Sequence, residues 1–254
     1  MQKEAWKMTA RGFRTGKFDK AILALGSCEA HGDHLPLGTD THVSYMLSCK
    51  AAEKLEGMLV LPPATVGCSA HYSGFPFTLY VSYETMTAVI KDILRSTIKN
   101  GIKKIFIMNG HDGNIAPIEM AAREIKVEYP DVRIANLDAW WVTAGKLLPQ
   151  DTFEVWNGLG HAGEGESSIA LQMFEEWCDM KHARGVVPDH LPEYVEMKWN
   201  FSELTDCAAT GDPTKATKAK GAKMEKVLID LIVDSVRALD KTDWNYVSTF
   251  PKKR

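Results

Sequence analysis

Several features are missing from this chain of 254 residues, and each absence excludes a class of protein. The five cysteines are odd in number and include no CxxC pair, so neither a disulfide framework nor a thiolate zinc site is expected. No apolar run approaches the roughly 20 residues that a membrane-spanning helix needs. The N-terminus lacks the continuous apolar core of a secretory signal, which predicts a cytoplasmic protein.

An excess of charge of either sign is also missing. The formal net charge of −3 gives no broad electrostatic attraction for nucleic acid or for an anionic membrane. Neither GxGxxG nor GxxxxGK[ST] occurs, which disfavours a nucleotide-binding regulator built on a phosphate loop. The sequence therefore predicts no nucleic-acid partner and no membrane partner.

Short apolar runs alternate with helical patterns along the chain. The runs are bounded by turn residues, as buried strands of a parallel sheet are, and the helical patterns show apolar residues at the spacing of one helix face. This alternation predicts an α/β fold with helices on both faces of a mainly parallel sheet, in a single domain over residues 1–254. Residues 206–220, rich in Thr, Gly, Asp and Lys, are expected to form an exposed loop. The expected strands are 21–25, 58–61, 104–108 and 132–137, and the clearest helices are 39–55, 86–98, 115–125 and 224–236.

What the chain does contain is carboxylate and imidazole groups at close spacing in three glycine-rich stretches, residues 29–40, 109–114 and 161–166. The first two follow expected strands, and the third precedes an apolar helical run. Ligand sites form beyond the carboxyl ends of parallel strands, so these stretches can meet at one edge of the sheet. Carboxylate and imidazole together suit a divalent metal ion, which makes a metal-dependent enzyme the leading hypothesis.

The spacing suggests which side chains could share such a site. Glu29 and His31 are two residues apart and point the same way in an extended segment. Asp40, at a helix start, can return toward them and bridge two cations, and His111 and Glu166 would complete a set of five ligands. The competing interpretation treats these acids as helix caps and the histidines as hydrogen-bonded surface residues.

Four motifs in this sequence resemble those of the creatininase family of amidohydrolases, in the family's order and over about residues 21–174. The second and third resemble the family's NGHGGN and HAGxxET(S) motifs, and the fourth element is similar to its SxxHxxFPGT loop. In this chain the motifs read GSCEAHGDHLPLGTD at 26–40, NGHDGN at 109–114, HAGEGESS at 161–168 and SAHYSGFPFT at 69–78.

The resemblance implies a three-layer α/β/α fold, a homo-oligomer with the hexamer as a common form, and a small-molecule substrate. It also implies two divalent metal ions per chain, of zinc, manganese or iron. The reaction would be hydrolysis of a non-peptide or cyclic amide C–N bond, with a metal-activated hydroxide attacking a carbonyl or amidine carbon. Carried over by motif, the metal ligands are Glu29, His31, Asp40, His111 and Glu166, with Asp40 bridging.

The same resemblance assigns supporting roles to neighbouring residues. His161 is the expected proton-transfer residue, and His34 is expected to support the metal ligands. The remaining candidates for contact with the ligands or the substrate are Asn109, Asp112, Ser69 and His71.

Departures from the family pattern argue against creatinine as the substrate. Gly113 stands where creatinine-hydrolysing members carry an acid, Asn157 and Gly158 replace a Trp-Asp pair, and Phe77 replaces the glycine of the FPGT loop. Creatinine is therefore a poor first guess. The alternatives are a formamide or formamidopyrimidine deformylase, a cofactor-maturation peptidase, and a catalytically silent metal-binding scaffold. The lack of a basic cluster near the motifs disfavours a phosphorylated substrate.

Overall fold

A computed structural model describes residues 2–188 and 197–247, and a parallel sheet lies at its centre. The strands are ordered β2-β1-β3-β4. Lys20 of β1 pairs with Met58 of β2 and Lys104 of β3, and all pairings are parallel. The carboxyl ends of the strands therefore lie at the same edge, as the α/β prediction requires. The strands are β1 (Lys20–Leu25), β2 (Met58–Val60), β3 (Lys104–Asn109) and β4 (Arg133–Leu137).

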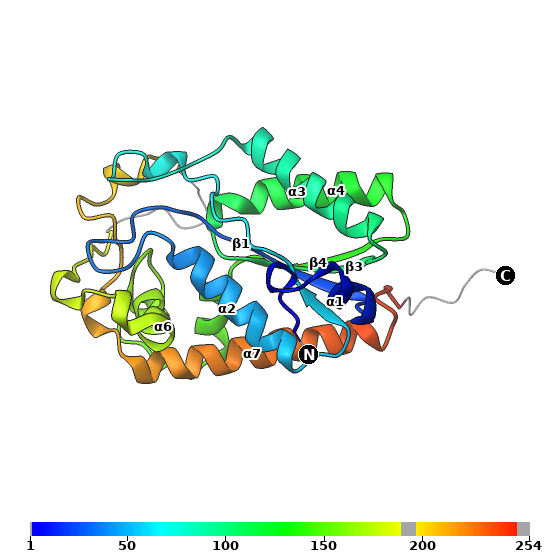
Figure 1. Ribbon diagram of the computed structural model, residues 1–254. Coiled ribbons are helices and arrows are strands. Elements are labelled where there is room, and N and C mark those ends of the chain that lie inside the picture. The colour runs from blue at the N-terminus through cyan, green and yellow to red at the C-terminus, as the bar shows by residue number, and fades with distance from the viewer. Residues whose placement is uncertain (1, 189–196, 248–254) are drawn as a thin grey trace.

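Helices cover both faces of the sheet, which confirms the three-layer α/β/α fold (Figure 1). One face is covered by α3 (Tyr83–Lys99) and α4 (Ile115–Glu128). The other is covered by α2 (Thr39–Glu53), α5 (Trp140–Leu147), α6 (Glu164–Phe174) and α7 (Lys218–Asp240). The short helix α1 (Ala10–Thr15) lies near the N-terminus, and 3-10 turns include Ala70–Tyr72, Asp112–Asn114, Trp156–Gly158 and Phe201–Glu203.

Sequence signals account for the limits of the long helices. Ser82 precedes α3, and its hydroxyl accepts a hydrogen bond from the Thr85 amide; Thr217 caps α7 through the Lys220 amide in the same way. Gly101, with φ +90°, ends α3 in a backbone conformation that favours glycine. Among the described residues, no helix combines the length and apolar composition that a membrane span requires.

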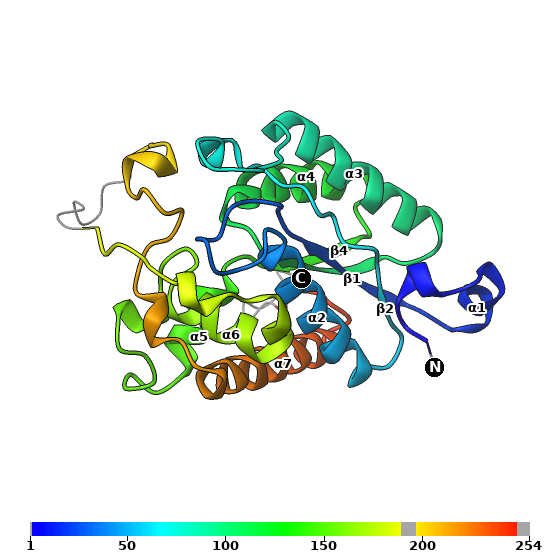
Figure 2. The ribbon, with the colours of Figure 1, turned by 60° about the vertical axis from the view of Figure 1, so that its left-hand side comes forward.

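The loop predicted to be exposed at residues 206–220 is partly buried, so that prediction is wrong for its first half. Cys207, Ala208, Ala209 and Thr210 are all buried. The Ala208 carbonyl accepts a hydrogen bond from the Gly32 amide (2.8 Å), and the Thr210 amide donates to the His161 carbonyl (2.8 Å). This segment runs to α7 along the end of the molecule that holds the motif loops (Figure 2). Small side chains let it pack against two of those loops, a tertiary contact that composition does not reveal.

Candidate metal centre

Glu29, Asp40 and His111 form one cluster of possible ligands at the carboxyl edge of the sheet. Glu29 follows β1, His111 follows β3, and Asp40 lies in the first turn of α2. His111 Nδ1 lies 3.3 Å from Glu29 Oε1 and 3.1 Å from Asp40 Oδ2. One ligand atom from each residue lies within 4.8 Å of the others, which is close enough to surround one cation.

Asp40 also belongs to a second group of possible ligands. Its other oxygen, Oδ1, lies 2.9 Å from His31 Nε2, and Glu166 Oε2 lies 3.9 Å from the same nitrogen. Glu166 comes from the first turn of α6. The two oxygens of Asp40 thus face two different histidines.

Backbone carbonyls orient both of these histidines. His31 Nδ1 donates to the Glu29 carbonyl (3.1 Å), which leaves Nε2 toward Asp40. His111 Nε2 lies 3.3 Å from the Cys68 carbonyl and 3.1 Å from Ser69 Oγ, which leaves Nδ1 toward the carboxylates. A hydrogen bond on one ring nitrogen fixes the tautomer and presents the other nitrogen as a ligand.

The carboxylates are buried in a way that calls for a cation. Both oxygens of Glu29 and Oδ2 of Asp40 are sealed from solvent and accept no hydrogen bond. Buried anionic oxygens without a partner are strongly unfavourable, so the donor set fits divalent ions that would coordinate these atoms.

The pKa shifts reflect the same crowding of charges. Burial by itself would lower the pKa of His31, but Asp40, Glu166 and Glu29 together raise it to about 9. Burial likewise opposes a proton on His111, yet Glu29 and Asp40 raise its pKa well above the usual value. The pKa of Glu166 is raised, because it is buried and lies near Asp40 and Glu29. Without metal, protons on the imidazoles balance the carboxylate charge.

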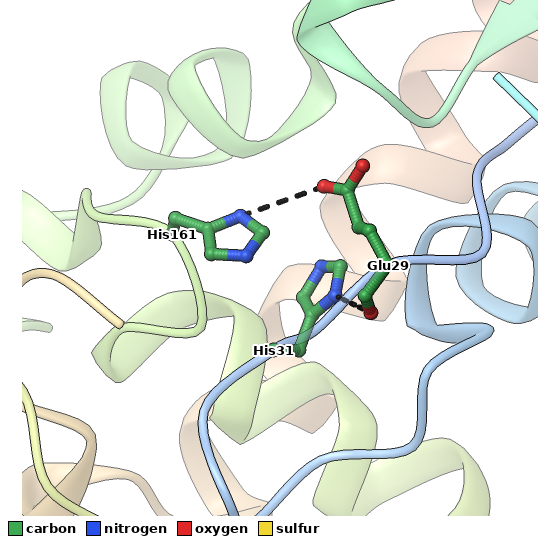
Figure 3. Close-up of side chains that lie close together, drawn as sticks. All are labelled: Glu29, His31 and His161. Atoms are coloured by element: carbon green, nitrogen blue, oxygen red, sulfur yellow. Dashed lines mark hydrogen bonds and ion pairs between the residues drawn. The ribbon is translucent and has the colours of Figure 1, made fainter. Parts of the chain in front are cut away.

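His161 lies beside this cluster (Figure 3). Unlike His31 and His111, it has a lowered pKa. Its Nε2 donates to the Ala30 carbonyl (2.8 Å), and its Nδ1 lies 3.9 Å from Glu29 Oε1. Burial and the charge of His31 lower its pKa to about 3, so the ring is neutral at neutral pH. Glu29, His31 and His161 also offer ligand atoms within 4.8 Å of one another, so His161 is close enough to act at the centre.

The remaining predicted residues surround the cluster at different distances. His34 Nε2 lies 2.9 Å from Ser167 Oγ and so joins the first motif to the third. Ser69 joins Ser27 to His111, and Asn109 Oδ1 accepts from the His111 amide (3.1 Å). The His71 ring stacks 6.0 Å from that of His111. Asp112 is exposed at the start of the turn after His111.

Two departures from the family pattern have a structural explanation. A Cβ at Gly113 would lie 2.3 Å from the Cys68 carbonyl oxygen, the same oxygen that faces His111 Nε2. The loop backbone therefore occupies the space that a side chain at position 113 would need. Phe77 has a left-handed backbone conformation, φ +54°, which favours glycine, and its ring is largely exposed.

The structure also brings in residues that the sequence did not single out. Tyr72 and Phe201 each contact the His161 ring, with centroids 4.5 and 5.0 Å away, and Thr210 Oγ1 accepts from the His161 amide (2.9 Å). Counting the SxxHxxFPGT pattern from Ser69 places Tyr72 at the histidine position, a signal that was available from the sequence. No local pattern marks Phe201 or Thr210, which reach the site from far along the chain.

Fold and site together define a three-layer α/β protein with a candidate metal centre at the carboxyl edge of its sheet. The family model for creatininase, described as creatinine amidohydrolase, matches residues 6–236. The chain belongs to the creatininase family.

Curated relatives of this chain have several activities. The mycofactocin precursor peptide peptidase of Mycobacterium ulcerans is 26% identical over 227 residues, which cover 85% of this chain and 83% of the relative. The creatinine amidohydrolase of Pseudomonas putida is 27% identical over 230 residues (85% and 88%). A 2-amino-5-formylamino-6-ribosylaminopyrimidin-4(3H)-one 5'-monophosphate deformylase of Methanococcus maripaludis is 36% identical over 207 residues (71% and 90%).

Solved structures share the fold. A Bacteroides fragilis protein provisionally named creatinine amidohydrolase superposes with a TM-score of 0.83 at 23% identity, covering 99% of this chain and 100% of its own. A manganese creatininase and a mutant creatininase of the Zn-Zn type each superpose with a TM-score of 0.78, at 22% and 23% identity, covering 94% of this chain and 98% of their own.

Proposed function

We propose that this chain is a metal-dependent amidohydrolase that cleaves a C–N bond of a non-peptide or cyclic amide in a small molecule. The observation that carries the proposal is the pair of buried carboxylates at the sheet edge, three of whose oxygens accept no hydrogen bond. Asp40 turns one oxygen to each of two oriented histidines, and both oxygens of Glu29 are buried without a hydrogen bond. Family membership supports the reaction class.

The proposed centre holds two divalent ions of zinc, manganese or iron. Glu29, Asp40 and His111 would hold one ion, and His31, Asp40 and Glu166 would hold the other. Mixed oxygen and nitrogen ligands suit these first-row metals. When bound, such ions would supply an activated water and polarise the scissile carbonyl.

His161 is proposed to move the proton that amide hydrolysis requires. Its Nε2 is engaged by the Ala30 carbonyl, so Nδ1 is the atom free to exchange a proton. The ring is neutral at neutral pH, so Nδ1 can accept a proton from the attacking water. The imidazolium so formed can then donate to the leaving nitrogen, and its neutral state returns for the next cycle.

The charges around the centre support an uncharged substrate. Among the described residues, the ion pairs of Glu29, Asp40 and Glu166 involve histidines alone. Selective binding of phosphate commonly uses lysine or arginine, and none pairs with this cluster. A neutral cyclic amide or formamide therefore fits better than a phosphorylated nucleotide.

Metal content tests the centre itself. The purified chain is expected to hold about two metal ions by elemental analysis, and Asp40→Ala to lose most of both because it removes the shared ligand. Chelation should abolish turnover of the best substrate in a panel of cyclic amides, formamides and short peptides. Unchanged metal content in Asp40→Ala would contradict the bridging role. Full metal occupancy with no activity on any compound would favour the scaffold.

A second variant tests the proton-transfer role. His161→Ala is expected to keep the metals and to lower turnover by on the order of 10² or more, as expected when a general acid and base is removed. Turnover equal to that of the unmodified protein would exclude this role for His161.

A further inference from the structure

Tyr72 occupies a central place at the candidate centre that the proposed reaction leaves unused. The residue is 6% exposed and ends the 3-10 turn Ala70–Tyr72. Its ring contacts those of His161 and Phe201, with both centroids 4.5 Å away, and that of His71 at 4.4 Å. Aromatic neighbours on several sides hold the phenol in one position.

The hydroxyl of Tyr72 has no hydrogen-bond partner in the described part of the chain. It is not among the unpartnered side-chain atoms that are sealed from solvent, so it stays accessible. The charges of Glu29, Glu166 and Asp40 nevertheless act on it, which places it within electrostatic reach of the carboxylate cluster. An accessible hydroxyl beside a reaction centre that has no protein partner is free to donate a hydrogen bond to a bound ligand.

The position also distinguishes this chain from the family pattern. Tyr72 falls at the histidine of SxxHxxFPGT, and a tyrosine there replaces an imidazole by a longer, neutral donor. His161, in ring contact with it, is the group that exchanges protons. A phenol next to it can instead donate a hydrogen bond throughout the reaction without giving up its proton.

We propose that Tyr72 is a catalytic residue whose hydroxyl donates a hydrogen bond to the oxygen of the scissile amide. The inference rests on the proposed amidohydrolase function. Attack on the amide carbon moves electrons onto that oxygen, and a donor already fixed in place stabilises the growing charge more than it stabilises the neutral amide. Packing against His161 and Phe201 provides this fixed geometry before the substrate binds.

The test compares Tyr72→Phe with Tyr80→Phe in the metal-loaded full-length chain. The first change removes the hydroxyl and keeps the ring contacts; the second removes a hydroxyl from a half-exposed tyrosine in the same loop. Affinity for acetohydroxamate, a small metal-binding analogue of an amide, is measured by calorimetry. It is expected to weaken about three- to tenfold in Tyr72→Phe alone, as for the loss of one hydrogen bond.

Turnover of the best amide in the panel provides the second readout. In Tyr72→Phe, kcat is expected to fall by on the order of 10² while KM changes little, because the bond strengthens in the transition state. Metal content and melting temperature should match those of the unmodified chain.

Each contrary outcome has a distinct meaning. Unchanged acetohydroxamate affinity and unchanged kcat in Tyr72→Phe would overturn the inference and leave the proposed function intact. A raised KM with unchanged kcat would overturn the catalytic role of Tyr72 in favour of a binding role. A loss of metal would overturn it in favour of a structural role. Failure of the unmodified chain to bind metal and acetohydroxamate would overturn the proposed function and this inference together.

Discussion

At the scale of single residues, the site is organised by which atom of each side chain faces inward. His31 presents Nε2 and His111 presents Nδ1, because the opposite nitrogen of each ring meets a backbone carbonyl or a serine. Asp40 lies between them and turns one oxygen to each. Such orientation is decided by hydrogen bonds outside the cluster, so Cys68 and Ser69 help to set which nitrogen of His111 faces the carboxylates.

The charge balance of the metal-free site leads to a pH-dependent prediction. His31 and His111 carry protons at neutral pH because their pKa values are raised above the ordinary 6.5. A metal needs the neutral imidazole, so binding of zinc is expected to release about two protons per chain at neutral pH. Calorimetry in buffers of different ionisation enthalpy measures this number. Heats that do not depend on the buffer would contradict it.

The sign of the accompanying stability change follows from the same shifts. A pKa raised in the folded state makes the protonated imidazole stabilising below about pH 6.5, and this contribution is lost as the pH rises through about 9. The metal-free protein should therefore lose stability over that window while its affinity for zinc increases. In the control variant His42→Gln this loss of stability with rising pH should be unchanged, because burial lowers the pKa of His42 and leaves it neutral over the same window.

At the scale of elements, helices α6 and α7 hold the third motif in place through a buried ion pair. Glu164, in the first turn of α6, accepts hydrogen bonds from the amides of Glu154 and Val155. It also pairs with Lys220 of α7 at 2.5 Å and is fully buried. This one carboxylate ties the loop before His161 to both helices.

Removing the Lys220 charge should destabilise the folded chain. Lys220→Met leaves the buried charge of Glu164 without its cation and is expected to lower the free energy of unfolding by about 2–3 kcal/mol, slightly less than for a wholly buried pair. Lys218→Met is the matched control on the same helix, because its pair with Glu175 is more than half exposed. Chemical denaturation measures both, and equal effects would contradict the role of the Glu164 pair.

At the scale of the whole molecule, the sheet connects the two layers of helices. Ile22 of β1 belongs to the apolar core under α2 and α7, whereas its neighbours Ala21 and Leu23 belong to the core under α3 and α4. Because successive residues of one strand stabilise both layers, we propose that the chain forms a single domain.

An exposed apolar segment before and at the start of α3 leads us to expect that the chain assembles. Phe77, Leu79, Tyr80 and Tyr83 are 45–66% exposed within seven consecutive residues, an apolar surface of the kind that subunit contacts cover. We propose that it contributes to a homo-oligomer. Sedimentation velocity should detect a multiple of the 28.3 kDa chain, and Leu79→Asp with Tyr83→Asp should reduce it. Trp177→Ser, at another exposed aromatic, serves as the control. A monomer at micromolar concentration would contradict the proposal.

The sequence by itself was enough to predict the four strands, the long helices and the main carboxylates and histidines that meet at the sheet edge. Buried strands require continuous apolar runs, and helices require apolar residues at helical spacing with caps, so both are readable locally. Parallel strands end at one edge, which is why Glu29 and His111 could be expected together although they are far apart in the chain. The motif resemblance identified the same family that the family model matches.

Only the tertiary structure decided how those residues face each other. The two-sided placement of Asp40, the free nitrogens of the histidines and the open hydroxyl of Tyr72 depend on contacts between distant segments. Residues 207–211 were expected to be exposed and are buried, because they pair with the loops of Gly32 and His161. Close packing fixes such distances, and no local pattern encodes packing between segments far apart in the chain.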